Sequence, residues 1–194
     1  MELIAHRINT VKLLKQIPLS CGVEIDIRTE NNNFILAHDP FQKGENLIKW
    51  LEYFEHKILI LNVKEEGLEK DLLKIMKKFS IKDFFFLDQS FPFLVKTSFS
   101  GESRTAIRFS EFESIENAYK LARKIDWVWV DFFNKFPLEF TQFKILKKYG
   151  YKICIVSPEL QGKSFEIVKD LKDYLKINRI KPDAICTKLL DFWS

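Results

Sequence analysis

The sequence lacks most of the features that mark secreted, zinc-binding or membrane proteins. Its three cysteines, Cys21, Cys154 and Cys186, stand far apart without CxxC spacing. A disulfide framework or a zinc site is therefore unexpected, and a reducing compartment fits. No apolar run is long enough to cross a bilayer. The start "MELIAHR" has no basic segment followed by an apolar one, so we expect no signal peptide and a cytoplasmic protein.

Glycine and charge of one sign are also scarce. The chain has six glycines, and its first predicted strand is not followed by the Gly-rich turn of dinucleotide-binding folds. The net charge is only +4, and lysines alternate with acids in segments such as "KSFEIVKDLKDYLKIN", as on a solvated helix face. We therefore expect no nucleic-acid partner. A mildly positive protein still favours an anionic substrate.

Short apolar runs, by contrast, are abundant. The 194 residues are 46% hydrophobic and include 19 phenylalanines, so we expect one domain, 1–194, with a sizeable core. A further short strand is predicted in "NNNFILAH", after a turn. Trp127 and Trp129 share one strand face and are expected to pack in the core against helices. The eight main predicted strands are 2–6, 22–27, 58–63, 83–87, 104–108, 126–131, 152–156 and 183–187.

Amphipathic segments alternate with these strands and predict helices at 10–16, 45–55, 66–79, 91–98, 112–124, 138–148 and 162–177. Alternation of strands and helices indicates parallel strands covered by helices. Runs such as "ILILNV" suit strands that are buried on both faces. Eight such strands predict an α/β fold of the (β/α)8 TIM barrel type, compact and with short loops because the chain is short for that fold. A doubly wound open sheet is the alternative.

Charged or ionisable residues follow every predicted strand, which is where the site of a parallel barrel lies. Glu24 and Asp26 in "VEIDIRT" stand out because two acids on one face of a strand repel each other. A shared Mg²⁺ or Ca²⁺ would compensate their charges. The alternative is a pair of surface carboxylates held by Arg7, Arg28 or Lys64.

Two histidines belong to the same part of the sequence. His6 ends the first predicted strand, and His38 ends the short extra strand with Asp39 directly after it. Two histidines can divide the duties of general base and general acid. The third histidine, His56 in "EYFEHK", is expected to be a cation at a helix C-terminus.

Together these motifs resemble the glycerophosphodiester phosphodiesterase family. "IAHR", "VEIDIRT" and "AHDP" are similar to the family pattern of HR, then E-x-D, then HD; "NVK" stands in place of E-x-K, and "DAICTK" in place of D-x-I-x-T-D. The resemblance covers the first third of the chain closely and the rest mainly through strand order. It implies a (β/α)8 barrel and a metal-dependent phosphodiesterase with a small-molecule phosphodiester substrate, which is either hydrolysed or closed to a cyclic phosphate.

The resemblance also implies roles for seven residues. A phosphodiester anion repels nucleophiles, so cations must draw charge from its oxygens. One histidine then activates water or a hydroxyl while the other protonates the departing alkoxide. The implied roles are catalytic for His6 and His38, phosphate-binding for Arg7 and Lys64, and binding of a divalent metal, Mg²⁺ or Ca²⁺, for Glu24, Asp26 and Asn62.

Three departures from the family pattern bear on these roles. The glycine that normally follows HR is Ile8, so the first turn must differ. The carboxylate of E-x-K is Asn62, whose amide contributes no charge. Metal affinity should therefore fall unless Asp39, Asp88 or Glu65 substitutes. The seventh strand ends in "VSPELQG" instead of a stretch with Trp and Thr.

Further candidate substrate contacts lie at the later strand ends: Arg108, Asp131, Glu159 and Lys188. Arg108 would clamp a second anionic group or pair with Glu111 or Asp131. Glu159 would bind an amine or hydroxyls, or cap the following segment.

Two alternatives to an ordinary phosphodiesterase stay open. The amide of Asn62 is also consistent with a catalytically impaired barrel that only binds a phosphorylated small molecule. The candidates at the later strand ends would instead serve an enzyme that processes a different phosphorylated substrate. The sequence specifies neither the alcohol groups of the substrate nor the oligomeric state.

Overall fold

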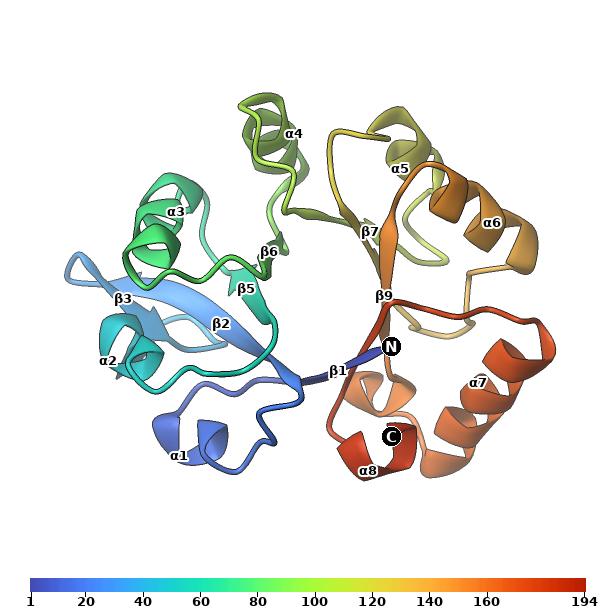
Figure 1. Ribbon diagram of the computed structural model, residues 1–194, viewed down its shortest axis with the longest axis horizontal. Helices are drawn as coiled ribbons and strands as arrows, with labels where there is room; N and C mark the ends of the chain where they lie inside the picture. Colours follow the sequence, from blue (N-terminus) through green and yellow to red (C-terminus); the bar gives the residue numbers. More distant parts are fainter.

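The eight predicted strands all form, and they pair in parallel around a closed barrel. The computed structural model describes residues 1–194. Hydrogen-bonded pairing runs from β7 through β8, β9, β10, β1, β2 and β5 to β6, and a bridge between Phe86 and Thr105 joins β6 to the start of β7. The prediction of a (β/α)8 barrel is thus confirmed (Figure 1). The strands are β1 Glu2–Ala5, β2 Gly22–Glu30, β5 Leu59–Val63, β6 Phe84–Leu87, β7 Ala106–Phe109, β8 Trp127–Val130, β9 Lys152–Val156 and β10 Ala184–Thr187.

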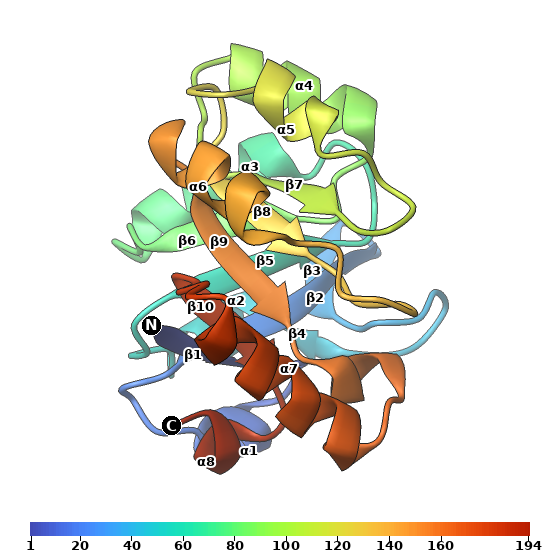
Figure 2. The same ribbon diagram turned by 90° about the vertical axis from the view of Figure 1, so that its right-hand side faces the viewer.

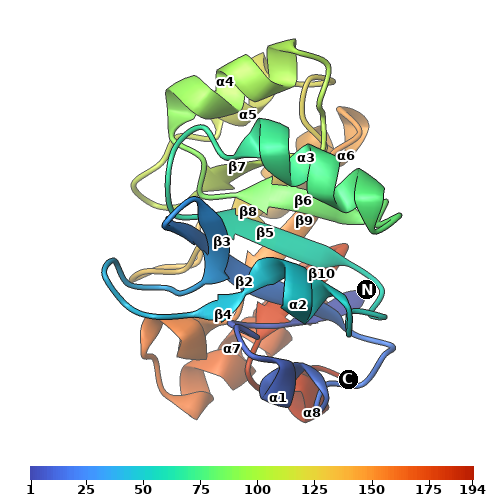
Figure 3. The same ribbon diagram turned by 90° about the vertical axis from the view of Figure 1, so that its left-hand side faces the viewer.

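A small antiparallel extension is built on the long strand β2. It consists of β3 Asn33–Leu36, which pairs with β2, and β4 Glu45–Asn46, which pairs with β3 (Figure 3). The turn between β2 and β3 holds Asn31 and Asn32, both with positive φ, a conformation that asparagine tolerates better than most residues. The extra strand predicted from the Asn run is therefore confirmed, and it carries His38 back to the end of the barrel.

Every predicted helix is present, but several are short. No helix of the chain combines the length and the apolar character needed to span a membrane. The last helix, α8, was not predicted. Figure 2 shows α6 and α7 on the outside of β9 and β10. The bounds are α1 Val11–Leu14, α2 Leu47–Leu51, α3 Glu69–Lys78, α4 Phe91–Phe99, α5 Glu116–Lys120, α6 Phe140–Lys148, α7 Phe165–Ile177 and α8 Leu190–Trp193, with a 3₁₀ turn at Pro158–Gln161.

The expectation that His56 is a cation at a helix C-terminus is wrong. The helix stops at Leu51, so His56 lies in the following loop and cannot act as a helix C-terminal cation. Its side chain is buried, its Nε2 lies 3.0 Å from the Ile17 carbonyl oxygen, and its ring stacks on Phe54. This histidine therefore helps to pack the loop.

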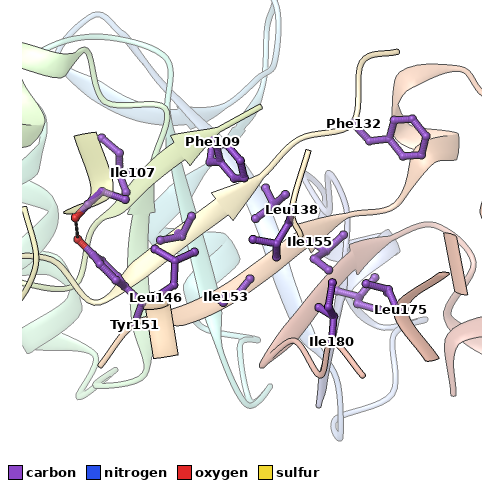
Figure 4. Close-up of a cluster of buried hydrophobic side chains, with 14 of the residues drawn as sticks. Ile107, Phe109, Phe132, Leu138, Leu146, Tyr151, Ile153, Ile155, Leu175 and Ile180 are labelled. Atoms are coloured by element: carbon purple, nitrogen blue, oxygen red, sulfur yellow. Dashed lines mark hydrogen bonds between the residues drawn. The ribbon is translucent and has the colours of Figure 1, made fainter. Parts of the chain in front are cut away.

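Two core clusters fill the space between the barrel and its helices. One joins the outward side chains of the later strands, such as Ile107 and Ile153, to Leu146 of α6 and Leu175 of α7 (Figure 4). Within it, the Tyr151 hydroxyl donates a 2.6 Å hydrogen bond to the Ala118 carbonyl. The second cluster does the same for the early strands and α1 to α3.

The inside of the barrel has its own apolar cluster, and this corrects the expected location of the tryptophans. Trp127 and Trp129 are buried, as expected, but they belong to the set of inward side chains together with Phe85 and Cys154. The rings of Phe85 and Trp127 stack with centroids 4.5 Å apart. The two tryptophans therefore fill the barrel and do not pack against helices.

Candidate active site

Glu24 and Asp26 point into the barrel because the strand alternates. Val23, Ile25 and Ile27 of β2 belong to the cluster under the helices, so the residues between them face inward. Both carboxylates are completely buried. The alternative of two surface carboxylates is therefore wrong, although two of the cations it named, Arg7 and Lys64, do lie beside the pair.

Glu24 is held by two hydrogen bonds, one to each carboxylate oxygen. The backbone N–H of Arg7 donates to Oε2 at 2.6 Å, and the Asn62 amide nitrogen donates to Oε1 at 2.8 Å. Arg7 adopts a left-handed conformation, with φ of +54°, in the turn after β1. The departure at Ile8 is thus met by a turn in which Arg7 takes the unusual φ and Ile8 is buried. Burial and the neighbouring Asp26 raise the pKa of Glu24 to about 7.

Asp26 is held by Asn9, a residue that no sequence motif singles out. Asn9 donates from its amide to Oδ2 at 2.8 Å, and its Oδ1 accepts from the Asp26 backbone N–H at 2.9 Å. Lys64 places its ammonium 3.3 Å from Oδ1, and the Nε of Arg7 lies 3.9 Å from Oδ2. The only sequence signal for Asn9 is its place in the polar turn "HRINT" directly after the first strand.

The two candidate catalytic histidines meet different surroundings. His6 is mostly buried, with Nε2 3.9 Å from Oε2 of Glu24 and no hydrogen-bond partner for Nδ1. Burial, with the nearby positive charges of Arg7 and Lys188, lowers the pKa of His6 to about 3, so the ring is neutral at pH 7.

His38 is half-buried and lies between the carboxylate of Asp39 and the guanidinium of Arg7. Its Nδ1 is 2.6 Å from Oδ1 of Asp39, and its Nε2 is 2.5 Å from Nη2 of Arg7. A guanidinium only donates hydrogen bonds, so Nε2 accepts and the ring proton sits on Nδ1, facing Asp39. This hydrogen bond from His38 holds the pKa of Asp39 below its usual value. The His-Asp pair of the sequence is thus a contact that fixes the imidazole orientation.

A chain of ion pairs crosses the barrel mouth on the other side of Lys64. Its ammonium lies 3.1 Å from Asp88, which in turn lies 2.6 Å from Arg108. Arg108 also contacts Asp131 at 2.5 Å and Glu113 at 3.1 Å. The predicted pair of Arg108 with Asp131 is confirmed. An arginine already surrounded by three carboxylates has little capacity to clamp a further anionic group.

Glu111 does not join this chain of ion pairs, against one of the expectations for Arg108. Its carboxylate instead accepts hydrogen bonds from the backbone N–H groups of Phe133, Asn134 and Lys135. These contacts hold the pKa of Glu111 below its usual value. Glu111 therefore anchors the loop after β8.

The carboxylate of Glu159 is hydrogen-bonded to residues at the ends of two neighbouring strands. One oxygen accepts from the Thr187 hydroxyl at 2.5 Å and from the Lys188 backbone N–H at 3.0 Å, and the other accepts from the Ser157 hydroxyl. Trp193 of α8 donates to the same Ser157 hydroxyl at 2.8 Å. Of the two roles considered for Glu159, these contacts favour the structural one, because they tie the end of β9 to the end of β10. The Lys188 side chain is exposed and forms no ion pair.

Two hollows lie near the strand ends, but neither is lined by the acid pair or by His6 and His38. One of about 300 Å³ is lined by Lys64, Asp88 and Gln89, and another of about 370 Å³ by Arg28 and Glu65 together with loop residues after β3. A hollow of about 430 Å³ lies at the opposite end of the barrel and contains none of the candidate residues.

The divalent metal predicted for Glu24, Asp26 and Asn62 stays a prediction, and the donors found here do not fit it. Three of the four carboxylate oxygens accept a hydrogen bond, and the fourth, Oδ1 of Asp26, has no hydrogen-bond partner but lies 3.3 Å from the Lys64 ammonium. Asn62 turns its nitrogen toward Glu24, while its oxygen is buried without a partner. No group of three His, Cys, Asp or Glu side chains in the chain is arranged to hold a metal ion.

None of the three acids expected to replace the missing carboxylate is free to do so. Asp39 is hydrogen-bonded to His38, and Asp88 lies between two cations. Glu65 accepts hydrogen bonds from Thr29, with one between its Oε2 and the Thr29 hydroxyl at 2.6 Å.

The fold and this site define a compact (β/α)8 barrel with histidines, acids and cations gathered at the carboxyl ends of its strands, where such barrels place their active sites. A glycerophosphodiester phosphodiesterase from Agrobacterium tumefaciens superposes with a TM-score of 0.68 at 12% identity, over 97% of this chain and 96% of that one. A glycerophosphoryl diester phosphodiesterase from Parabacteroides distasonis gives 0.65 at 15% identity, over 96% and 82%. The sequence matches no protein-family profile and no curated protein. The chain therefore has the fold of the glycerophosphodiester phosphodiesterases, as its motifs predict.

Proposed function

We propose that the protein is a phosphoric diester hydrolase that acts on a glycerophosphodiester-like small molecule. The observation that carries this proposal is the position of Arg7. Its backbone N–H binds Glu24 beside His6, and its guanidinium binds Nε2 of His38. Arg7 thus links His38 to the carboxylate that lies beside His6, and it places a cation next to His38, where a phosphate group would need one. The likeness in fold to the two phosphodiesterases supports the same reaction class.

The proposed roles follow from the contacts of each side chain. Asp39 accepts from Nδ1 of His38 and would stabilise the imidazolium form. In the proposed reaction the substrate phosphate draws the Arg7 guanidinium away from Nε2, Nε2 takes up a proton, and His38 then acts as the general acid that gives this proton to the leaving alkoxide. His6 is neutral at pH 7 and has no carboxylate within hydrogen-bond distance, so its free ring nitrogen acts as the base that takes a proton from water. Arg7 and Lys64 draw charge from the phosphate oxygens.

Turnover of bis(p-nitrophenyl) phosphate and of glycerophosphodiesters, each with a chelator and with Mg²⁺, Ca²⁺ or Mn²⁺, tests this proposal. His6→Ala and His38→Ala should each lower kcat about 10²- to 10⁴-fold, as expected for loss of a general acid or base. His56→Asn is the matched control because His56 lies in the loop after α2, and it should leave kcat unchanged. Full activity of His6→Ala would refute the assignment.

A second candidate is a barrel that binds a phosphorylated small molecule without cleaving it. The amide at Asn62 and the hydrogen bonds that occupy Glu24 favour it. It predicts ligand-induced thermal stabilisation in the absence of turnover. Measurable hydrolysis that depends on His6 would exclude it. The cytoplasmic location expected from the sequence remains a prediction.

A further inference from the structure

The position of Lys64 points to a departure from the metal-dependent chemistry that the sequence motifs imply. We propose that Lys64 is the permanent counter-ion of the buried acid pair, Glu24 and Asp26, and that this pair takes no divalent cation. The catalytic consequence, phosphodiester hydrolysis without added metal, rests on the function proposed above.

Strand geometry places Lys64 directly over the pair. Asp26 and Asn62 are register partners on the neighbouring strands β2 and β5. Lys64 lies two residues beyond Asn62, so both side chains point to the same inner face. The Lys64 backbone N–H donates to the Ile27 carbonyl at 3.0 Å, which continues the pairing of the two strands past the end of β5. The ammonium is thus held by the same strand pairing as the acids.

The local charges are already matched without a metal. Lys64 lies 3.3 Å from Asp26 and 3.1 Å from Asp88, and Arg108 binds the other oxygen of Asp88. The Nε of Arg7 adds a second positive charge 3.9 Å from Asp26. A divalent ion on the pair would be repelled by both cations, and this repulsion is strong because the carboxylates are excluded from water.

The hydrogen-bond donors around the acid pair also disfavour a divalent ion. Mg²⁺ and Ca²⁺ require several oxygen atoms that point toward one centre. Asn62 instead presents an N–H to Glu24, and Asn9 and the backbone of Arg7 present two more donors to the pair. Binding an ion here would break these hydrogen bonds and turn the amide of Asn62 around. The residue at position 62 therefore selects between a hydrogen-bonded pair and a metal site.

Mn²⁺ binding, followed by electron paramagnetic resonance of the free ion, is the direct test, with melting temperature in Mg²⁺ or Ca²⁺ as a second readout. The wild-type protein should leave the Mn²⁺ signal and the melting temperature unchanged. Asn62→Glu restores a carboxylate and should bind Mn²⁺ and gain stability with each ion. Asn62→Glu combined with Asp26→Asn should lose that gain. Mn²⁺ binding by the wild type that disappears in Glu24→Gln would overturn the proposal.

Activity gives an independent check. With a chelator or with Mg²⁺, the wild-type rate should differ by less than about twofold, whereas metal-activated hydrolysis gives far larger effects. A metal requirement for turnover would overturn the counter-ion proposal and leave the proposed function in place. Absence of turnover in every condition would overturn the proposed function alone, since Mn²⁺ binding decides the counter-ion without it.

Discussion

Replacing Lys64 by methionine should destabilise the protein much more than the same change at a surface lysine. Methionine keeps most of the length of the side chain and its packing, so the change removes mainly the ammonium. In the wild type this ammonium lies 3.3 Å from a carboxylate of Asp26 that is completely buried. Removing it leaves a buried negative charge without its nearest cation.

The magnitude follows from the distance and the remaining contacts. Two unit charges at this separation attract each other by about 5 kcal/mol at an effective dielectric constant of about 20. Ordering the long lysine side chain offsets up to about 2 kcal/mol of this. Asp26 keeps its two hydrogen bonds with Asn9, and Asp88 keeps Arg108. We therefore expect Lys64→Met to lower the unfolding free energy by about 3 kcal/mol, near the lower end for a broken buried pair.

Lys57→Met is the matched control. Lys57 lies 3.4 Å from Glu2, nearly the same separation, but both side chains are about half exposed. Its loss should cost less than about 1 kcal/mol. Urea unfolding followed by tryptophan fluorescence measures both variants, with an unchanged m-value as evidence that the same transition is compared. Equal costs for the two lysines would refute the reasoning, because burial would then have no effect on the pair.

Two further predictions concern other carboxylates of the mouth. Burial raises the pKa of Asp131 to about 6 from 3.8, despite the opposing effect of Arg108. The folded protein then retains the proton of Asp131 to higher pH than the unfolded chain does. The contribution of Asp131 to the unfolding free energy therefore falls as pH rises from about 4 to about 6, by at most about 3 kcal/mol. The difference in unfolding free energy between the wild type and Asp131→Asn, measured across this pH range, should show the decline. A difference that stays flat or rises with pH would contradict it. Glu159→Ala should cost about 2 kcal/mol through its lost hydrogen bonds with KM unchanged, whereas a raised KM would indicate substrate contact.

The strands and helices could be predicted because apolar residues recur along the sequence with the period of the strand or helix that buries them. β5 and β6 are continuous apolar runs, and such runs suit strands covered on both faces. Alternation on β2 placed Glu24 and Asp26 on one face in advance. Some predicted helices are longer than the observed ones. The helix predicted at 45–55 ends at Leu51 in the structure, because the loop that follows α2 has a similar amphipathic pattern.

The partners of the acid pair could not be predicted in full, because they come from turns whose conformation depends on the whole fold. Asn9 lies 17 residues before Asp26, and its place in a polar turn after the first strand does not show which residue it binds. The sequence predicts the wrong neighbours for Trp127 and Trp129 because it does not specify which face of an apolar strand lies inside the barrel. Only barrel closure decides that the larger residues fill the centre.

The sequence by itself determined eight parallel strands alternating with helices and the concentration of histidines, acids and cations at the carboxyl ends of the strands, since periodicity and strand order are properties of the chain. Only the tertiary structure decided that the strands close into a barrel and do not form an open sheet. The tertiary structure decided what compensates Glu24 and Asp26. That compensation depends on the direction of the Asn62 amide and on 3.3 Å between Lys64 and Asp26. Such orientations arise only when neighbouring strands are in register, because hydrogen bonds and ion pairs in a buried site depend on ångström-scale geometry.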